Sequence, residues 1–224
     1  MRVGAETLFK VTREDGGPTR GSGKWPLPRG KKLGAWREVE GPLVACENGL
    51  HLARGPQVLR WLGLRLFVAE YDGELIEAGD KVVVRKARLV SECRWDERIA
   101  RLFAADCAEA VLHIYERWVP GDSRPREAVE VARRFANGDA TRAELAAAGD
   151  AARAAAWAAR PAVGGAAWTA WAARDAAGGA AWAAGDAARD AAGAARAAAG
   201  AAEFEDANRL IFLRLCEYLN GDLA

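Results

Sequence analysis

Neither sign of charge is in excess in this sequence of 224 residues. Its 32 lysines and arginines almost cancel its 31 aspartates and glutamates, so the formal net charge is +1. A protein with this balance has no overall field that would attract phosphate backbones or anionic lipid. The composition therefore gives nucleic-acid binding no support and predicts no attraction to a membrane surface.

Histidine and cysteine are also scarce, and the cysteines form no CxxC pair. The chain contains only these residues of the two types: His51, His113, Cys46, Cys93, Cys107 and Cys216. Their wide spacing argues against a zinc site, which needs ligands in close pairs, and against a disulfide framework. We therefore expect no bound metal and a protein of the reducing cytoplasm.

Long hydrophobic runs are missing as well. No segment of about 18 apolar residues, the length that spans a bilayer, is free of charged residues. The longest candidate, AAGGAAWAAG, consists of alanine and glycine around one tryptophan. The opening segment, MRVGAETLFK, lacks the apolar core of a signal peptide. We expect neither a membrane span nor a secretory signal.

Strand-like segments dominate the first 95 residues. The runs LFKVTR, LHLAR, LRLFVAEY and KVVVRKARLV are rich in β-branched and aromatic residues, and EDGG, PRGKK and YDGE are turn signals between runs. The segment GPQVLRWLG, between two of the runs, is typical of a short helix. This pattern predicts a small α+β domain over residues 1–95 with a mostly antiparallel sheet.

Helical signals begin immediately afterwards. Asp96 precedes apolar residues at helical spacing and predicts the N-cap of a helix over 96–118. A second helix is expected over 123–137, because a proline falls in its first turn and Asn-Gly follows its last. Thr141 and Glu144 form a capping-box pattern that predicts the start of a third helix.

Alanine dominates residues 143–202. Alanines recur there with a period of eleven residues, which keeps one face of a nearly straight helix small. A break is expected near residue 162, at Arg160-Pro161, and a terminal helix is expected over 204–219. The large apolar side chains expected to close the helical hairpin are Leu210, Ile211, Leu215 and Leu219. The whole chain is therefore predicted to be an α+β protein, with an alanine-rich helical bundle or hairpin over 96–224.

Tryptophans and charged residues share the helical arc opposite the alanines. The candidate partner-binding residues on this arc are Trp168, Trp171, Trp182, Arg174, Asp175 and Asp186. Tryptophan and arginine are frequent at the energetic centres of protein interfaces, and fixed charges set register. The alternative is that the rings fill space between the alanine helices and the rest of the fold.

A recognisable pattern lies within residues 98–145. Its specific positions are Asp106, Cys107, Ala108, Val111, Leu112, Ile114, Tyr115, Glu116, Pro120, Asp122, Arg124, Pro125, Arg126 and Ala128. With the alanine and tryptophan repeats and the closing helix, this pattern resembles the immunity proteins of bacterial polymorphic-toxin systems. The resemblance implies a protein-binding, immunity or antitoxin-like role in bacterial or phage conflict, in which a rigid helical face neutralises a partner.

The first part of the chain resembles a different module, a domain of unknown function found in phage and bacterial genomes. The shared segments are Arg20-Gly21, CENGLH at 46–51 and LFVAEYDGELIEAGDK. The order of elements is also similar to the core of ADP-ribosyltransferases that use NAD. That similarity implies an NAD-dependent enzyme as the alternative function, although the first strand reads FKVT where those enzymes carry a His-Gly-Thr or Arg motif.

Under the enzyme alternative, the catalytic candidates are His51, Glu77 and Asp80. His51 could bond a ribose hydroxyl or act as a base, and the acids of the segment EYDGELIEAGD, which include Glu70 and Glu74, could place one carboxylate near it. The other interpretation is structural: His51 bonds a neighbouring backbone group, and the acids are exposed. We favour a non-enzymatic protein without a cofactor.

Other residues allow both functional and structural interpretations. Cys46 could be a nucleophile if the fold brought a base to it, whereas Cys107 is expected to be a small buried residue and His113 a surface residue. The segment TRGSGKW, with Gly21 to Gly23 and Lys24, could contact a phosphate, but a flexible loop is favoured. A third function class, self-assembly, follows if the alanine faces pair between chains, so a homo-oligomer is possible.

Overall fold

The computed structural model describes residues 2–19, 21–163 and 205–223. The chain divides into two compact units, one comprising residues 1–95 with 216–224 and the other comprising residues 96–215. The first unit carries the strands and the second carries the helices, so the α+β class predicted from the sequence is confirmed.

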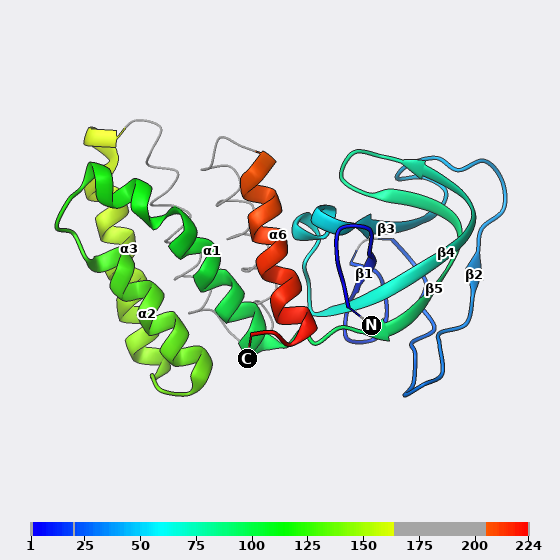
Figure 1. Ribbon diagram of the computed structural model, residues 1–224, viewed down its shortest axis with the longest axis horizontal. Coiled ribbons are helices and arrows are strands. Elements are labelled where there is room, and N and C mark those ends of the chain that lie inside the picture. Colours follow the sequence, from blue (N-terminus) through cyan, green and yellow to red (C-terminus); the bar gives the residue numbers. More distant parts are fainter. Residues whose placement is uncertain (1, 20, 164–204, 224) are drawn as a thin grey trace. The chain divides into compact units, whose positions relative to one another are not determined.

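All strand pairings in the first unit are antiparallel. The elements are β1 (Leu8–Thr12), β2 (Arg37–Glu38), β3 (Leu50–Arg54), the 3-10 helix η1 (Gly55–Arg60), β4 (Arg65–Glu77) and β5 (Val82–Glu92). Their pairing order is β2-β5-β3-β1-β4, and β4 also pairs with β5. The four longer strands therefore close into a small barrel, with β2 attached to β5 (Figure 1). We call the first unit the barrel unit.

Strand register determines which side chains face the interior of the barrel. Directly paired residues of neighbouring strands point to the same face. Leu8 pairs with Ala69, and Leu52 pairs with Val82, and all of these belong to one buried cluster. Lys10 pairs with Phe67, another member of that cluster. The register therefore places a lysine on the apolar inner face of β1.

The predicted turn at YDGE is wrong, because β4 continues through this segment to Glu77. The register with β5 shifts between Asp72 and Leu75, and Gly73 has φ 82°. A β-bulge with a glycine in the left-handed region absorbs the extra residue without ending the strand. The chain reverses later, where the Ala78 N–H donates to the carbonyl oxygen of Lys81 at 2.9 Å.

The end of the chain is part of the first unit. Arg2 forms an ion pair of 2.5 Å with Asp222, and the Val3 N–H donates to the side-chain oxygen of Asn220 at 2.9 Å. Residues more than two hundred positions apart in sequence are thus held together at the edge of this unit.

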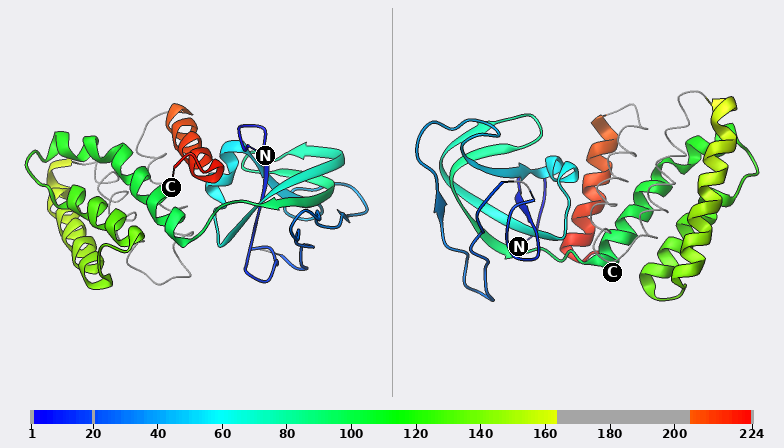
Figure 2. Two further views of the ribbon diagram at one scale, coloured as in Figure 1. Left: turned by 60° about the horizontal axis from the view of Figure 1, so that its bottom comes forward. Right: turned by 180° about the vertical axis from the view of Figure 1, so that it is seen from behind.

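The second unit is built from helices. Within residues 96–163 and 205–223 the helices are α1 (Glu97–Trp118), α2 (Arg124–Asn137), α3 (Arg142–Val163) and α6 (Glu205–Asn220). The last residues of α6, from Cys216, belong to the first unit, and we call the second unit the helical unit. Helix α2 packs against both α1 and α3, and the three run side by side (Figures 1 and 2). None of the described helices is both long and apolar enough to cross a membrane.

Local signals placed the described helix ends correctly. The Asp96 carboxylate accepts a hydrogen bond of 2.8 Å from the Ile99 N–H, so the predicted N-cap is confirmed. Helix α2 stops where Gly138 adopts φ 86°, as the Asn-Gly pattern predicted. The Thr141 hydroxyl and the Glu144 carboxylate bond each other's backbone N–H, which confirms the capping box. Alanines of α3, including Ala152, pack directly on Ala128 of α2.

The terminal helix forms as predicted, but one of its expected core residues is wrong. Ile211, Leu215 and Leu219 are buried, whereas Leu210 is 66% exposed. A helix rotates about 100° per residue, so a core face centred on Ile211 and Leu215 turns Leu210 outward. The predicted break near residue 162 falls at the edge of the described residues, and the repeat beyond Val163 lies outside them.

Candidate functional site in the barrel unit

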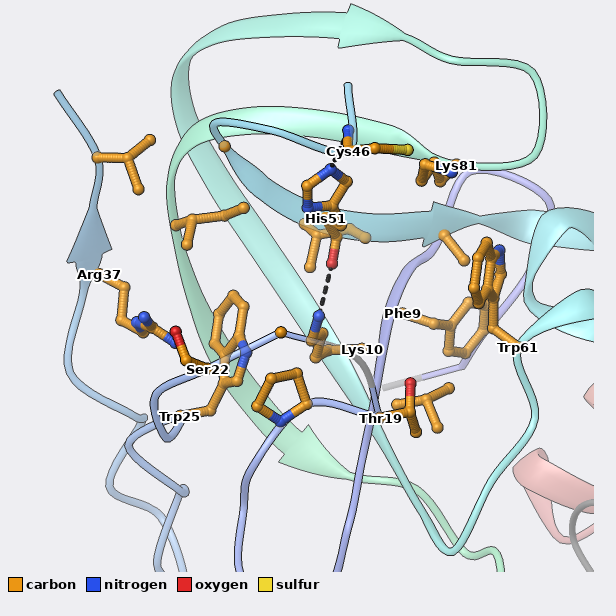
Figure 3. A pocket seen from close by; sticks show the side chains of 18 of the residues that line it. Phe9, Lys10, Thr19, Ser22, Trp25, Arg37, Cys46, His51, Trp61 and Lys81 are labelled. Carbon is orange, nitrogen blue, oxygen red and sulfur yellow. Dashed lines mark hydrogen bonds between the residues drawn. The ribbon is translucent and has the colours of Figure 1, made fainter. Parts of the chain in front are cut away.

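A cavity of about 510 Å³ opens in the first unit. Strands β1, β2 and β3 contribute to its walls, together with the loops that contain Trp25 and Cys46. Its floor is apolar, with Phe9, Val11 and Leu52 among the lining residues. Lysine and arginine side chains from separate elements complete the lining (Figure 3).

Lys10 lies at the centre of this arrangement. Its ammonium donates a hydrogen bond of 2.9 Å to the carbonyl oxygen of His51 and lies 5.1 Å from the ring centroid of Trp25. Figure 3 shows Trp25 on one side of Lys10 and Trp61 on the other. Burial, and then the charge of Arg37, lower the pKa of Lys10 to about 8. Lys10 is thus a cation in an environment that opposes its charge.

Arg37 is the second cation beside the same ring. Its guanidinium lies 5.2 Å from the centroid of Trp25, and its strand register with Ala87 places it on the inner face of the barrel. Among the described residues, no carboxylate lies within ion-pair distance of Lys10 or Arg37. Trp25 therefore supplies the only cation–π contact that either has in the described part of the chain.

His51 holds the loop that borders the cavity. The backbone N–H of Cys46 donates to its Nε2 atom at 3.0 Å, which requires that nitrogen to be unprotonated. Burial, and then the charges of Lys10 and Lys81, lower the pKa of His51 and favour the neutral ring. Cys46 has φ 69°, a left-handed conformation that a side chain rarely adopts, so this hydrogen bond anchors a strained residue. His51 also lines the cavity.

Lys81 reaches the cavity from the β4–β5 turn. Its ammonium forms an ion pair of 2.9 Å with Asp80 and lies 5.1 Å from the ring centroid of Trp61. The Trp61 indole N–H in turn donates to the Asp80 carbonyl oxygen at 2.8 Å. Unlike Lys10, Lys81 already has a carboxylate partner. The hydrogen bond to Asp80 raises the pKa of Lys81.

The predicted catalytic acids do not gather around His51. Glu77 pairs with Arg54 at 2.8 Å, and Asp80 pairs with Lys81, and neither is among the described residues that line the cavity. Glu70 and Glu74 form cross-strand pairs with cations of β5. Because β4 continues through the bulge, these acids spread along a strand instead of clustering at one turn.

Sequence reasoning missed the cations of the cavity and the tryptophan ring beside two of them. Lys10, Trp25, Arg37 and Lys81 were not candidates, and they come from separate segments of the chain. One signal was available for Lys10, a charged residue in the middle of the apolar strand LFKVT. The glycine loop contributes Gly21 to the cavity lining, but the described residues contain no group of ligands that could hold a metal.

The other single-residue predictions concern the helical unit. Cys107 is 2% exposed and burial raises the pKa of its thiol, so its prediction as a small buried residue is confirmed. His113 is on the surface, also as predicted. The predicted partner-binding residues lie outside the described residues: Trp168, Trp171, Trp182, Arg174, Asp175 and Asp186.

The pattern that suggested an immunity protein stabilises the hairpin of α1 and α2. The Tyr115 hydroxyl donates to Asp122 at 2.7 Å, and Arg124 donates to both oxygens of the same carboxylate. Glu116 of α1 pairs with Arg126 of α2 through two hydrogen bonds of 2.7 and 2.8 Å. These contacts fix the turn and the start of α2.

Asp106 connects further helices at the centre of the same pattern. Its carboxylate accepts from Arg133 of α2 at 2.7 Å and forms an ion pair of 3.1 Å with Arg214 of α6. The neighbouring Cys107 and Ala108 are buried. The charged positions of the pattern therefore hold helices together, and the small positions allow them to pack.

Comparison with protein families gives a match to the same part of the chain. A family model described as "Imm-5 like putative immunity protein" matches residues 95–214, more than half of the chain. The chain belongs to this family. Neither the curated proteins nor the solved structures that were searched gave a match. The Imm-5 like match covers nearly all of the helical unit and includes only Trp95 of the barrel unit.

Proposed function

We propose that this Imm-5 like protein is an immunity protein whose helical unit, residues 96–215, binds and neutralises a protein toxin. The observation that carries the proposal is the coincidence of the family match, residues 95–214, with this unit. An immunity role requires a protein partner. It requires no catalysis, so a rigid helical face is sufficient.

The partner surface that we propose uses side chains that the helical unit leaves exposed. The family pattern is occupied internally, because Asp106, Tyr115 and Glu116 bond other helical residues. Leu210 and Leu213 of α6 are 66% and 48% exposed, and large exposed apolar side chains on one helix face favour protein contact. We add the sequence-derived set Trp168, Trp171, Trp182, Arg174, Asp175 and Asp186 to this surface.

Co-expression with a toxin tests the function. Protein domains that co-purify with the full chain and are identified by mass spectrometry would be expressed in bacteria with and without the chain, and growth and complex formation would be measured. We expect the chain to restore growth and to co-elute with the toxin domain in size-exclusion chromatography. A folded chain that neither protects the cells nor co-elutes would contradict the proposal.

Paired variants test the surface. The double variants Leu210→Ala/Leu213→Ala and Trp171→Ala/Trp182→Ala should each weaken toxin binding more than tenfold, because truncating an interface anchor removes contacts that exclude water. Leu33→Ala, at an exposed leucine of the barrel unit, is the matched control. Arg196→Ala should have a much smaller effect, because helical spacing predicts Arg196 on the flank of the tryptophan arc and removing a charge at the rim of an interface costs little. Loss of the cooperative thermal transition in the tryptophan variant would instead assign those rings to the core.

A further inference from the structure

The barrel cavity lies outside the part of the chain that carries the proposed immunity role. The family match begins at residue 95, whereas the cavity-lining residues lie between Phe9 and Lys81. Its volume of about 510 Å³ falls within the range of small-molecule sites, roughly 300 to 1,000 Å³. Its walls combine apolar side chains with a few charged groups, which is the usual composition of a ligand site.

The described residues leave the positive charge of Lys10 and Arg37 in the cavity without an ion-pair partner. Lys10 and Arg37 both face the interior beside Trp25, and neither has a carboxylate partner among the described residues. Placing a cation in a partly desolvated site without an opposite charge is unfavourable. A cation–π contact contributes only about 0.5 to 2 kcal/mol, so Trp25 compensates for little of this cost. An anion would supply what is missing.

Other charged lining residues do not meet this need. Lys81 is already paired with Asp80 at 2.9 Å. Glu47, the acidic residue among the described lining residues, is exposed and forms no ion pair with Lys10 or Arg37. The unmatched positive charge is therefore located on one side of the cavity, around Trp25.

The aromatic residues indicate the shape of the rest of the ligand. Trp25 and Trp61 line the cavity on either side of Lys10 (Figure 3), and Phe9 and Leu52 contribute apolar surface between strands. Flat rings favour planar groups, which stack on them or meet their edges.

We propose that this cavity binds a small organic anion. Its phosphate or carboxylate lies against Lys10 and Arg37, and its planar body packs between the aromatic side chains. The cavity differs from the toxin-binding surface in location and chemistry, so this proposal stands independently of the immunity role.

Two pairs of probes test the ligand chemistry in isothermal titration calorimetry with the full chain. Adenosine 5′-monophosphate is compared with adenosine, and 1-naphthoate with 1-naphthamide. Each pair shares a planar body and differs in the anionic group. We expect at least one anion to bind at least tenfold more tightly than its neutral counterpart. Tighter binding of adenosine 5′-monophosphate would then identify the anionic group of the ligand as a phosphate, and tighter binding of 1-naphthoate would identify it as a carboxylate.

Matched variants locate the binding. Lys10→Met and Arg37→Met should each weaken binding of the preferred anion at least tenfold. Lys86→Met is the matched control, because Lys86 is paired with Asp72 at 3.0 Å and is not among the cavity-lining residues, and it should change binding less than threefold. Arg37→Met keeps the test decisive if Lys10→Met does not fold. Far-ultraviolet circular dichroism verifies the folding of each variant. The proposal is overturned if neither anion binds more tightly than its neutral counterpart, or if Lys86→Met weakens binding as much as the other variants.

Discussion

Asp122 shows how one carboxylate can fix a helical turn. It lies between α1 and α2, where it accepts hydrogen bonds from the Tyr115 hydroxyl and from the Arg124 guanidinium, and its side chain is only 12% exposed. The Arg124 hydrogen bonds are the main cause that lowers the pKa of Asp122 to about 2, with Tyr115 adding to the effect. The charged form is therefore the one that the folded state prefers.

This preference predicts a loss of stability in acid. The folded pKa of Asp122 lies below its ordinary value of 3.8, so its contribution is complete above about pH 4 and is lost as pH falls toward 2. Asp122→Asn should lower the free energy of unfolding at pH 7 by about 1–2 kcal/mol and flatten its dependence on pH below 4. Urea denaturation at several pH values measures both effects.

Asp139→Asn is the matched control for that measurement, because Asp139 is an exposed acid in the next interhelical turn. It should leave stability within about 0.5 kcal/mol of the wild type. Equal losses in the two variants would show that the contacts of Asp122 contribute nothing specific.

Strand β4 contains a β-bulge at Gly73 and continues through it. Gly73 has φ 82° at a register shift, and no atom lies within 4 Å of the position where a Cβ would be. Because space is available, the cost of a side chain at this position comes from backbone conformation alone. The bulge keeps Glu70 and Glu74 in line with cationic partners on β5.

Substitutions at Gly73 should therefore follow conformational preference. Gly73→Val should lower the free energy of unfolding by about 1–2 kcal/mol, and Gly73→Asn by less than half as much, because asparagine tolerates the left-handed region. Chemical denaturation measures the difference. Gly4→Ala is the control, since Gly4 has open space around it without a positive φ, and it should cost almost nothing. Equal effects of valine and asparagine would contradict a conformational origin.

The chain alternates between its two units instead of completing one before the other. Residues 1–95 are joined by residues 216–224, and residues 96–215 form the unit between them. The Arg2–Asp222 ion pair and the bond between Val3 and Asn220 tie the chain end to the first unit. Whether each unit folds without the other can therefore be tested with fragments of the chain.

We expect fragment 96–224 to fold without the first 95 residues, because its helices carry their own caps and apolar faces. Circular dichroism should show a helical spectrum and a cooperative thermal transition. Fragment 1–95 should be less stable than the same residues in the full chain, because it lacks residues 216–224. A weakly helical fragment 96–224 with a gradual transition would show that the helical unit depends on the barrel unit.

Interactions between near neighbours in sequence could be predicted without a structure. The caps at Asp96, Gly138 and Thr141 depend on backbone groups within a few residues, so their spacing in the sequence is sufficient. The same holds for the antiparallel strands, whose composition and alternation are local, and the immunity resemblance was carried by one continuous stretch. The family match confirms that resemblance over residues 95–214.

Tertiary structure alone decided where long-range partners meet. Lys10, Trp25 and Arg37 come together because separate strands and a loop close one barrel, and their sequence spacing contains no information about that closure. The exposure of Leu210 likewise depends on which face of α6 is covered. The sequence by itself determined the helix ends at Asp96, Gly138 and Thr141, because hydrogen bonds between near neighbours set them. It did not determine the extent of β4, because the pairing with β5 carries that strand through YDGE. The pairing of distant strands formed the cavity and placed Lys10 and Arg37 beside Trp25, because only the folded chain brings these three residues within contact distance.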